Sequence, residues 1–87
     1  MKSNKNSILD NICYTELVYE RINKKLVTNM TRSQIESLLY ETIKNTPLED
    51  FQKSGKNYYI SNAKKNIRVT INSFTNRVIT VDKIKNI

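Results

Sequence analysis

Hydrophobic side chains recur at helical spacing through the first half of the chain. Between residues 7 and 27 they return every three or four positions, with one gap near Thr15, where a second helix could begin. We therefore predict one helix or two in this segment. A further helix is predicted from Thr31, because Thr31 and Gln34 have the spacing of a capping box. It ends before the Thr-Pro pair at 46–47, because the residue that precedes proline disfavours helical backbone.

Alternating apolar and polar positions replace this spacing in the second half. Residues 58–62, 67–72 and 77–81 are predicted as strands, whereas 48–53 fits either a short strand or a turn. Gly55, the only glycine, lies in a predicted turn at the position that needs a positive φ. The short connections between these segments favour an antiparallel meander.

These elements predict a single α+β domain over residues 1–87. Two or three N-terminal helices (7–45) pack on one face of a three- to four-stranded antiparallel β-meander (48–85), and residues 1–6 are expected to be disordered. The one cysteine, Cys13, lies among apolar residues and is predicted to be a small, reduced core side chain.

The composition excludes several classes of protein. The chain has one Cys, one Gly and no His. It therefore cannot form an internal disulfide, a classical zinc module, a glycine-rich dinucleotide site or a catalytic site built on histidine. We expect no cofactor and no metal. No apolar run has the length of a signal peptide or a membrane span, which predicts a cytoplasmic protein with no membrane partner.

The excess of positive charge is confined to the second half. The formal net charge is +7, yet residues 1–50 carry seven basic and seven acidic side chains, while residues 51–87 carry eight basic side chains and one acid, Asp82. This asymmetry predicts an anionic partner for the C-terminal half, most often nucleic acid. The alternative is a solvated basic surface that reflects a composition rich in Lys, Asn and Ile.

Period-two alternation divides the strand residues between two faces. In the last strand it predicts that Ile79 and Val81 point toward the helices and Val78 away from them. The residues predicted on the face away from the helices are Tyr59, Arg68, Thr70, Asn72 and Thr80. Four basic residues near the strand ends are expected to reach the rim of this face: Lys53, Lys56, Arg77 and Lys83.

A tyrosine beside an arginine, with hydroxyls and a basic rim, suits a single-stranded nucleic acid, because the ring stacks on bases and the cations hold phosphates. The predicted binding residues are Lys56, Tyr59, Arg68, Thr70, Asn72, Arg77, Thr80 and Lys83. Cleavage of RNA without histidine is feasible where Arg and Lys stabilise the phosphorane and a Lys or Tyr transfers protons. The catalytic candidates are Arg68, Arg77, Lys53 and Tyr59, together with Lys56. Asp82 is expected to pair with a nearby lysine. The alternative for all of these is an ordinary solvated sheet face.

Four short motifs, in order along the chain, carry a resemblance to a known family. They are Thr15-Glu16-Leu17 with Arg21-Ile22, Gly55-Lys56-Asn57-Tyr58-Tyr59, Ile67-Arg68-Val69-Thr70-Ile71-Asn72, and Val78-Ile79-Thr80-Val81-Asp82-Lys83. From about Cys13 to Lys85 the chain resembles a small bacterial family of unknown function, whose pattern is T-E-L…R-I, G-K-N-[WY]-Y, I-T-V-N and I-[IV]-T-A-H-K. Asp82 stands where this family has His, and Tyr14 where some members have His. A role that rests on those histidines does not carry over.

A more distant likeness concerns the order of the elements. Helices followed by a meander, with G-K-x-Y-Y, V-x-I and V-I-T-V near the end, are similar to the ribonuclease-toxin superfamily that joins barnase, colicin nucleases and RelE-like toxins. RelE-like members act through Lys, Arg and Tyr. This likeness implies RNA cleavage and an antitoxin partner, and it is an analogy at the level of the fold.

Three kinds of function fit these observations. The first is a toxin-like domain that interacts with RNA or another single-stranded nucleic acid; if it is an enzyme, it is a metal-independent endoribonuclease. The second is a non-catalytic protein-binding module, such as an inhibitor or an antidefence protein of mobile-element origin. Such a module would bring the same basic face to an acidic partner, an antitoxin or a target enzyme. The third is a structural domain whose edge strand pairs two chains.

Overall fold

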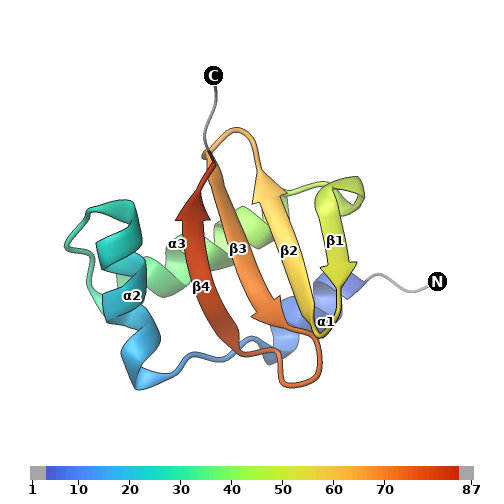
Figure 1. The fold of residues 1–87 in the computed structure, drawn as a ribbon, viewed down its shortest axis with the longest axis horizontal. Coiled ribbons are helices and arrows are strands. Elements are labelled where there is room, and N and C mark those ends of the chain that lie inside the picture. Colours follow the sequence, from blue (N-terminus) through green and yellow to red (C-terminus); the bar gives the residue numbers. More distant parts are fainter. Residues whose placement is uncertain (1–3, 85–87) are drawn as a thin grey trace.

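The computed structural model describes residues 4–84 and confirms the α+β class (Figure 1). Three helices and one short 3-10 helix precede or join a four-stranded sheet. In chain order the elements are α1 (Asn4–Asn11), α2 (Glu16–Leu26), α3 (Arg32–Asn45), η1 (Leu48–Asp50), β1 (Phe51–Ser54), β2 (Asn57–Asn62), β3 (Ile67–Asn72) and β4 (Val78–Lys83).

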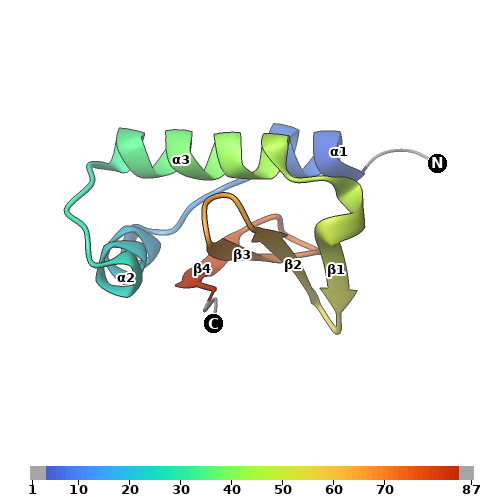
Figure 2. The same cartoon turned by 90° about the horizontal axis from the view of Figure 1, so that it is seen from above.

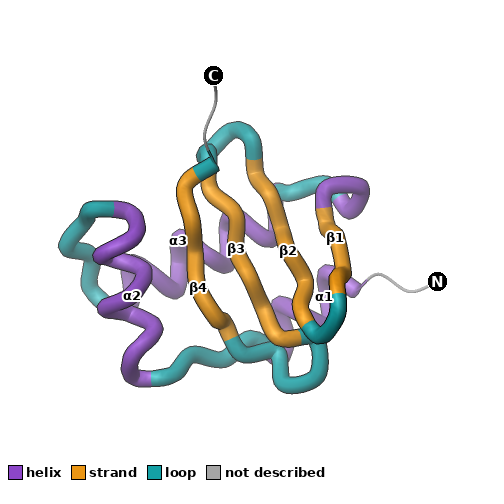
Figure 3. Tube along the Cα trace, viewed as in Figure 1, coloured by secondary structure: helices purple, strands orange, loops and turns teal. Residues whose placement is uncertain are grey.

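The sheet is a meander with helices on one face only. Its strand order is β1-β2-β3-β4, with every neighbour antiparallel (Figure 3). Figure 2 shows α1 and α3 side by side on one face, and α2 beside the β4 edge. No described helix covers the opposite face, which we call the outer face. A strand pattern with one apolar side predicts this arrangement, because only that side needs a cover.

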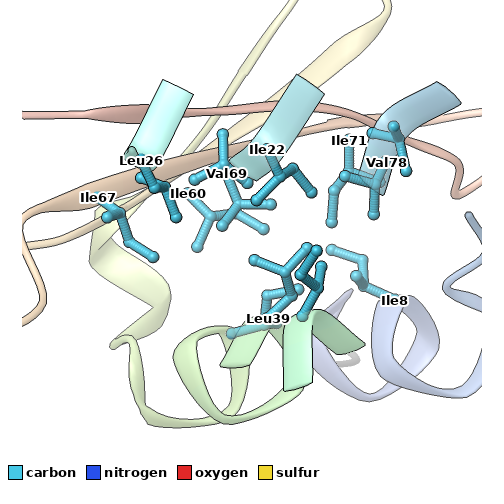
Figure 4. Close-up of a cluster of buried hydrophobic side chains, with 13 residues drawn as sticks. Ile8, Ile22, Leu26, Leu39, Ile60, Ile67, Val69, Ile71 and Val78 are labelled. Atoms are coloured by element: carbon cyan, nitrogen blue, oxygen red, sulfur yellow. The ribbon is translucent and has the colours of Figure 1, made fainter. Parts of the chain in front are cut away.

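The core lies between α1, α2, α3 and the inner face of the sheet (Figure 4). Ile22 and Leu39 come from helices, and Ile60 and Val69 from the central strands, and all four are 0% exposed. Within residues 4–84 the buried hydrophobic residues of the core are Ile8, Val18, Ile22, Leu26, Ile35, Leu39, Ile43, Ile60, Ile67, Val69, Ile71, Val78 and Val81. Their helical and period-two spacing is the signal from which the sequence predicts these elements.

A buried polar network joins the end of α3 to β2. Asn62, 6% exposed, donates from Nδ2 to Thr46 Oγ1 at 2.9 Å and to Thr42 O at 3.4 Å. Its Oδ1 accepts the Lys65 N–H at 2.9 Å, which also fixes the β2–β3 turn. These bonds satisfy groups whose burial would otherwise be costly, so the network holds the helix layer on the sheet.

Polar contacts join α2 to the edge strand. Arg21 Nη1 donates to Ile79 O at 3.2 Å, and Lys25 Nζ lies 2.9 Å from Asp82 Oδ1. The expected pairing of Asp82 with a lysine is confirmed, with Lys25 as the partner. Because α2 lies along β4, it protects that edge of the sheet, while β1 forms the other edge.

Several local predictions are confirmed. Thr31 Oγ1 accepts the Gln34 N–H and Gln34 Oε1 accepts the Thr31 N–H, which completes the capping box. The helix ends at Asn45, before the Thr-Pro pair, and Gly55 has φ +62°. The segment that fitted one helix or two forms two, and 48–53 holds a 3-10 turn followed by the start of β1.

The sequence predicts that residues 1–6 are disordered and that the meander continues to residue 85. α1 begins at Asn4, so residues 4–6, expected to be disordered, are helical. Residues 1–3 and 85–87 lie outside the described part of the chain. No helix within residues 4–84 has the length and apolar character needed to cross a membrane.

The predicted alternation in the last strand is wrong at Val78 and Ile79. A register shift pairs Thr80 with Thr70 but Val78 with Ile71, so β4 has one extra residue, Ile79. Val78 is therefore buried in the core at 2% exposure and Ile79 is half-buried. A bulge inverts the alternation on one side of itself, which a strict period of two cannot anticipate.

The prediction that Cys13 is a core residue is also wrong, since its side chain is exposed. Cys13 lies in the connection between α1 and α2, which passes the start of β4. Its N–H donates to Asn76 O and its carbonyl accepts the Val78 N–H, both at 3.0 Å. The backbone of Cys13 therefore extends the sheet by one bridge, while the thiol donates to carbonyls of the β3–β4 turn.

Candidate nucleic-acid interface

Cross-strand register arranges the outer face in three rows. In the middle row, Tyr59 pairs with Thr70 and Thr70 with Thr80. In a second row Arg68 pairs with Ser61 and with Asp82. The third row continues from Asn57 and Asn72 to Arg77. The five residues predicted on this face, Tyr59, Arg68, Thr70, Asn72 and Thr80, all belong to these rows.

The middle row is less open than predicted. Tyr59 is half-buried, and Thr70, a predicted binding residue, is only 5% exposed although no described helix covers it. Thr80 Oγ1 is buried and has no hydrogen-bond partner within the described residues. Thr70 lies on a central strand, with Tyr59 on one side and Thr80 on the other. The surrounding side chains therefore cover its small side chain. A ligand on this face would meet Tyr59 and Arg68 before it met either threonine.

Tyr59 and Arg68 are diagonal neighbours on adjacent strands. Tyr59 pairs with Thr70, two residues from Arg68, a placement that brings long side chains within reach of each other. Arg68 is exposed. The predicted placement of a tyrosine and an arginine as neighbours on the outer face is therefore confirmed.

The row of Arg68 also holds the only acid of the second half. Asp82 lies opposite Arg68, and its carboxylate binds Lys25 from α2 at 2.9 Å. Two cations thus flank one carboxylate, so this part of the face keeps a positive balance. The contribution of α2 could not be predicted from the strands alone.

The row of Arg77 lies at the end of the sheet that carries the β1–β2 and β3–β4 turns, which we call the turn end (Figure 1). The Asn72 N–H donates to Arg77 O at 2.9 Å, which continues the pairing one residue beyond β4. Because the neighbouring Val78 is buried, alternation places the Arg77 side chain on the outer face. Arg77, predicted at the rim, is therefore on the face itself.

Asn72 has a structural role in this row. Its Oδ1 accepts the N–H groups of Phe74 at 2.8 Å and Thr75 at 3.0 Å, and its carbonyl accepts the Asn76 N–H at 2.8 Å. The side-chain oxygen of Asn72 is thus occupied in forming the β3–β4 turn. Asn76 supplies the positive φ, 59°, that this turn requires.

The remaining basic candidates lie beside the outer face. Lys53 pairs with Tyr58 and Lys83 with Ile67, which are rows of the inner face, although both lysine side chains are exposed at the strand ends. Lys56 lies in the β1–β2 turn, exposed at the turn end. Lys53 and Lys83 therefore contribute to the field around the sheet rather than to the surface of the outer face.

The structure separates the two arginines proposed for catalysis. Four residue steps along β3 separate the row of Arg68 from the row of Arg77, in which Asn72 is bonded to Arg77, about 13 Å at the usual rise of a strand. Both guanidinium groups could contact one phosphodiester only if the two side chains extended toward each other along the sheet. The predicted catalytic and binding residues are therefore spread along the length of a strand, and the catalytic assignment stays a prediction.

Shifted pKa values occur in the helical half. Tyr14 and Tyr19 stack with ring centroids 5.6 Å apart, and the Arg32 guanidinium lies 4.8 Å from the Tyr19 ring. Burial and the hydrogen bond to Glu36 raise the pKa of Tyr19 to about 12. Burial likewise raises the pKa of Tyr14, and the Arg32 guanidinium lowers the pKa of Glu16. This cluster ties α2 to α3 and was not predicted.

Comparison with known protein families shows the family to which the chain belongs. Residues 6–82 match the sequence model of the family described as a protein of unknown function, DUF3781, and the chain belongs to that family. The match runs from α1 to β4, which confirms the resemblance to a small family of unknown function. Searches of curated proteins and of solved structures both found no significant match. The likeness to ribonuclease toxins stays a prediction.

Proposed function

We propose that this protein binds single-stranded RNA along its outer face and does not cut it. The observation that supports the proposal is the outer face itself, where Tyr59 and Arg68 are diagonal neighbours and Arg77, paired with the end of β3, stands at the turn end. Helices cover only the inner face and the β4 edge (Figure 2), which leaves a surface long enough for several nucleotides.

The side chains of this face match the needs of a single strand. Base stacking on an aromatic ring contributes about 1–3 kcal/mol per base and tolerates any sequence. Tyr59 offers the ring, and its hydroxyl accepts a long hydrogen bond, 3.4 Å, from Asn57 Nδ2. Arg68 beside it provides a cation for phosphate or a planar group for stacking. Hydroxyl and amide groups of Ser61 and Asn57 suit the ribose 2′-hydroxyl, which distinguishes RNA from DNA.

The charge distribution supports a strand that crosses the face lengthwise. Exposed cations lie at both ends of the sheet, with Lys56 and Arg77 at the turn end and Lys64 and Lys65 at the opposite end, in the β2–β3 turn. Successive phosphates of an extended strand can meet these cations in turn, which one small anion cannot do. Such contacts release counterions and make binding depend on salt.

The same spacing argues against cleavage. Hydrolysis or transesterification of one phosphodiester needs a base, an acid and a stabilising positive charge around the same phosphorus. The rows of Arg68 and Arg77 are about 13 Å apart along β3, so both side chains would have to extend toward each other to act on one phosphate. A denaturing gel of RNA incubated with the protein therefore shows no fragments under this proposal. Defined fragments that disappear in an Arg68→Ala, Arg77→Ala double variant would establish the ribonuclease alternative instead.

The direct experiment is fluorescence anisotropy with a labelled U-rich RNA of about 12 nucleotides, within the range of known single-strand sites. Arg68→Gln removes one cation from the outer face. Lys44→Gln removes one from α3, on the other side of the sheet, where Lys44 is exposed. We expect Arg68→Gln to weaken binding and to reduce the salt slope by about 0.7, and Lys44→Gln to leave both unchanged.

Three results would contradict the proposal in different ways. Equal losses in both variants would mean that net charge, and not the outer face, attracts RNA. Equal affinity for RNA and for DNA of the same length would remove the role given to the 2′-hydroxyl. No binding by the natural protein at low salt would favour the alternative of an acidic protein partner on the same basic surface.

A further inference from the structure

The β3–β4 turn presents an aromatic ring to solvent. Phe74 is 73% exposed, so the ring gains little from packing against its own chain. The backbone beneath it is nonetheless held firmly. Asn72 binds the N–H groups of Phe74 and Thr75 through one side-chain oxygen, and the Arg77 N–H donates to Thr75 Oγ1 at 3.3 Å. A rigid turn thus fixes the place from which the ring projects.

Two cationic residues lie near Phe74 along the backbone. The Ser73 N–H donates to Lys56 O at 2.7 Å, which joins the β1–β2 turn to the β3–β4 turn. Lys56 is thereby held beside the residue that precedes Phe74. Arg77 follows three residues after Phe74 and lies on the outer face, and both cationic side chains are exposed. The turn end therefore carries an exposed ring and two exposed cationic side chains on neighbouring stretches of backbone.

This combination has the chemistry that a nucleotide requires. A base can stack on the exposed π-face, and neighbouring phosphates can bind the lysine and the arginine. The turn end lies where a strand that follows β3 past Tyr59 and Arg68 would leave the sheet. Stacking at both places would hold two bases several nucleotides apart and fix the path between them.

We propose that Phe74, Lys56 and Arg77 form a second stacking site, which holds one nucleotide of the single-stranded RNA at the turn end. This inference rests on the proposed function and assigns to that function a residue, Phe74, that the strand alternation does not reach. Phe74 supplies the stacking surface, and Lys56 and Arg77 supply contacts to the flanking phosphates.

The chain contains no tryptophan, which allows a specific optical test. Phe74→Trp places a single indole at the proposed site, and Tyr40→Trp places one on α3, where Tyr40 is 43% exposed and lies on the far side of the sheet. Both reporters are titrated with the same U-rich RNA while anisotropy follows binding. We expect the RNA to quench the indole fluorescence at position 74 saturably, with the same midpoint as the anisotropy curve. We expect no quenching of the indole at position 40.

A second variant separates stacking from charge. Phe74→Ala is expected to weaken binding by about 5- to 150-fold, the range for loss of one stacked base, with an unchanged salt slope because no cation is removed. Lys56→Gln and Arg77→Gln are each expected to lower that slope by about 0.7. Circular dichroism spectra and melting curves of all variants establish that the fold is retained.

The outcomes distinguish this inference from the function on which it rests. If the natural protein binds RNA and Arg68→Gln weakens it, but Phe74→Ala binds normally and the reporter at 74 is not quenched, the second stacking site is wrong and the outer face remains. If the natural protein does not bind RNA at low salt, the proposed function fails and this site fails with it.

Discussion

Replacing Asn62 with alanine should loosen the attachment of α3 to the sheet. The Asn62 amide is 6% exposed and serves two elements at once: it donates to Thr46 Oγ1 at the end of α3 and accepts the Lys65 N–H in the β2–β3 turn, each at 2.9 Å. Asn62→Ala removes both bonds and leaves a small polar void, because a methyl group reaches neither partner.

The expected loss is about 2–3 kcal/mol of unfolding free energy. Each well-formed hydrogen bond contributes about 1 kcal/mol net, and a buried partner left without its bond adds to this cost. The Thr46 hydroxyl keeps its own bond to Thr42 O, and Lys65 is an exposed residue whose N–H can bind water, so this added cost is small. For a domain of this size the loss corresponds to a fall in Tm of about 8–24 °C.

Urea denaturation followed by circular dichroism measures this loss directly. Asn45→Ala is the matched control, because Asn45 is exposed at the end of the same helix and its change should stay within about 0.5 kcal/mol. Thr46→Val completes a double-mutant cycle with Asn62→Ala, in which we expect a coupling of at least about 0.5 kcal/mol. Two results would refute the claim that this network attaches α3 to β2. One is a loss of stability for Asn62→Ala no larger than that of Asn45→Ala, and the other is additive losses for Asn62→Ala and Thr46→Val.

Two further predictions concern backbone strain and pH. Val27 ends α2 with a left-handed backbone, at φ 57°, and its side chain is 80% exposed. Asparagine tolerates this backbone better than valine, so Val27→Asn should raise the free energy of unfolding by about 1 kcal/mol in the same assay. A loss of stability would contradict the assignment of backbone strain to Val27. The Tyr19 pKa is raised from 10.0 to about 12 by burial and by Glu36. The unfolded chain therefore releases this proton first, and the stabilisation present below pH 10 is lost as pH rises toward 12. Tyr19→Phe should lose less stability than the natural protein across that interval, and equal losses in the two would show that Tyr19 does not control it.

The fold could be predicted where local signals and periodicity agree. The capping box at Thr31, the turn at Gly55 and the stop before Pro47 are confirmed, because each depends on a few adjacent residues. The faces of β2 and β3 are also as predicted, since six regular residues in each strand carry a clear alternation.

The wrong predictions concern residues whose positions depend on contacts between distant segments. The bulge at Ile79 moved Val78 into the core, and no residue in the short β4 strand marks it. Cys13 is exposed because the α1–α2 connection adds one bridge to β4, a pairing across more than 60 residues that alternation does not reveal. Such tertiary pairing overrides local preference.

The candidate site was predicted in part for the same reason. Alternation found Tyr59 and Arg68, but the burial of Thr70 depends on its place at the centre of the sheet. The outward position of Arg77 depends on the bulge, and the exposed ring of Phe74 depends on a turn that alternation does not describe. The signal for this site was Phe74, an aromatic residue within a turn segment. Its closeness to Lys56 arises only when the chain folds.

The most direct test of the central claim is the salt dependence of binding between the natural protein and a single-stranded RNA. Contacts from Arg68, Arg77, Lys56, Lys64 and Lys65 predict a fall of log K with log salt concentration with a slope of about −3.5, and a slope of about −2 once Arg68→Gln and Arg77→Gln are combined. A slope that the double variant leaves unchanged, or no binding even at low salt, would contradict the account of the outer face.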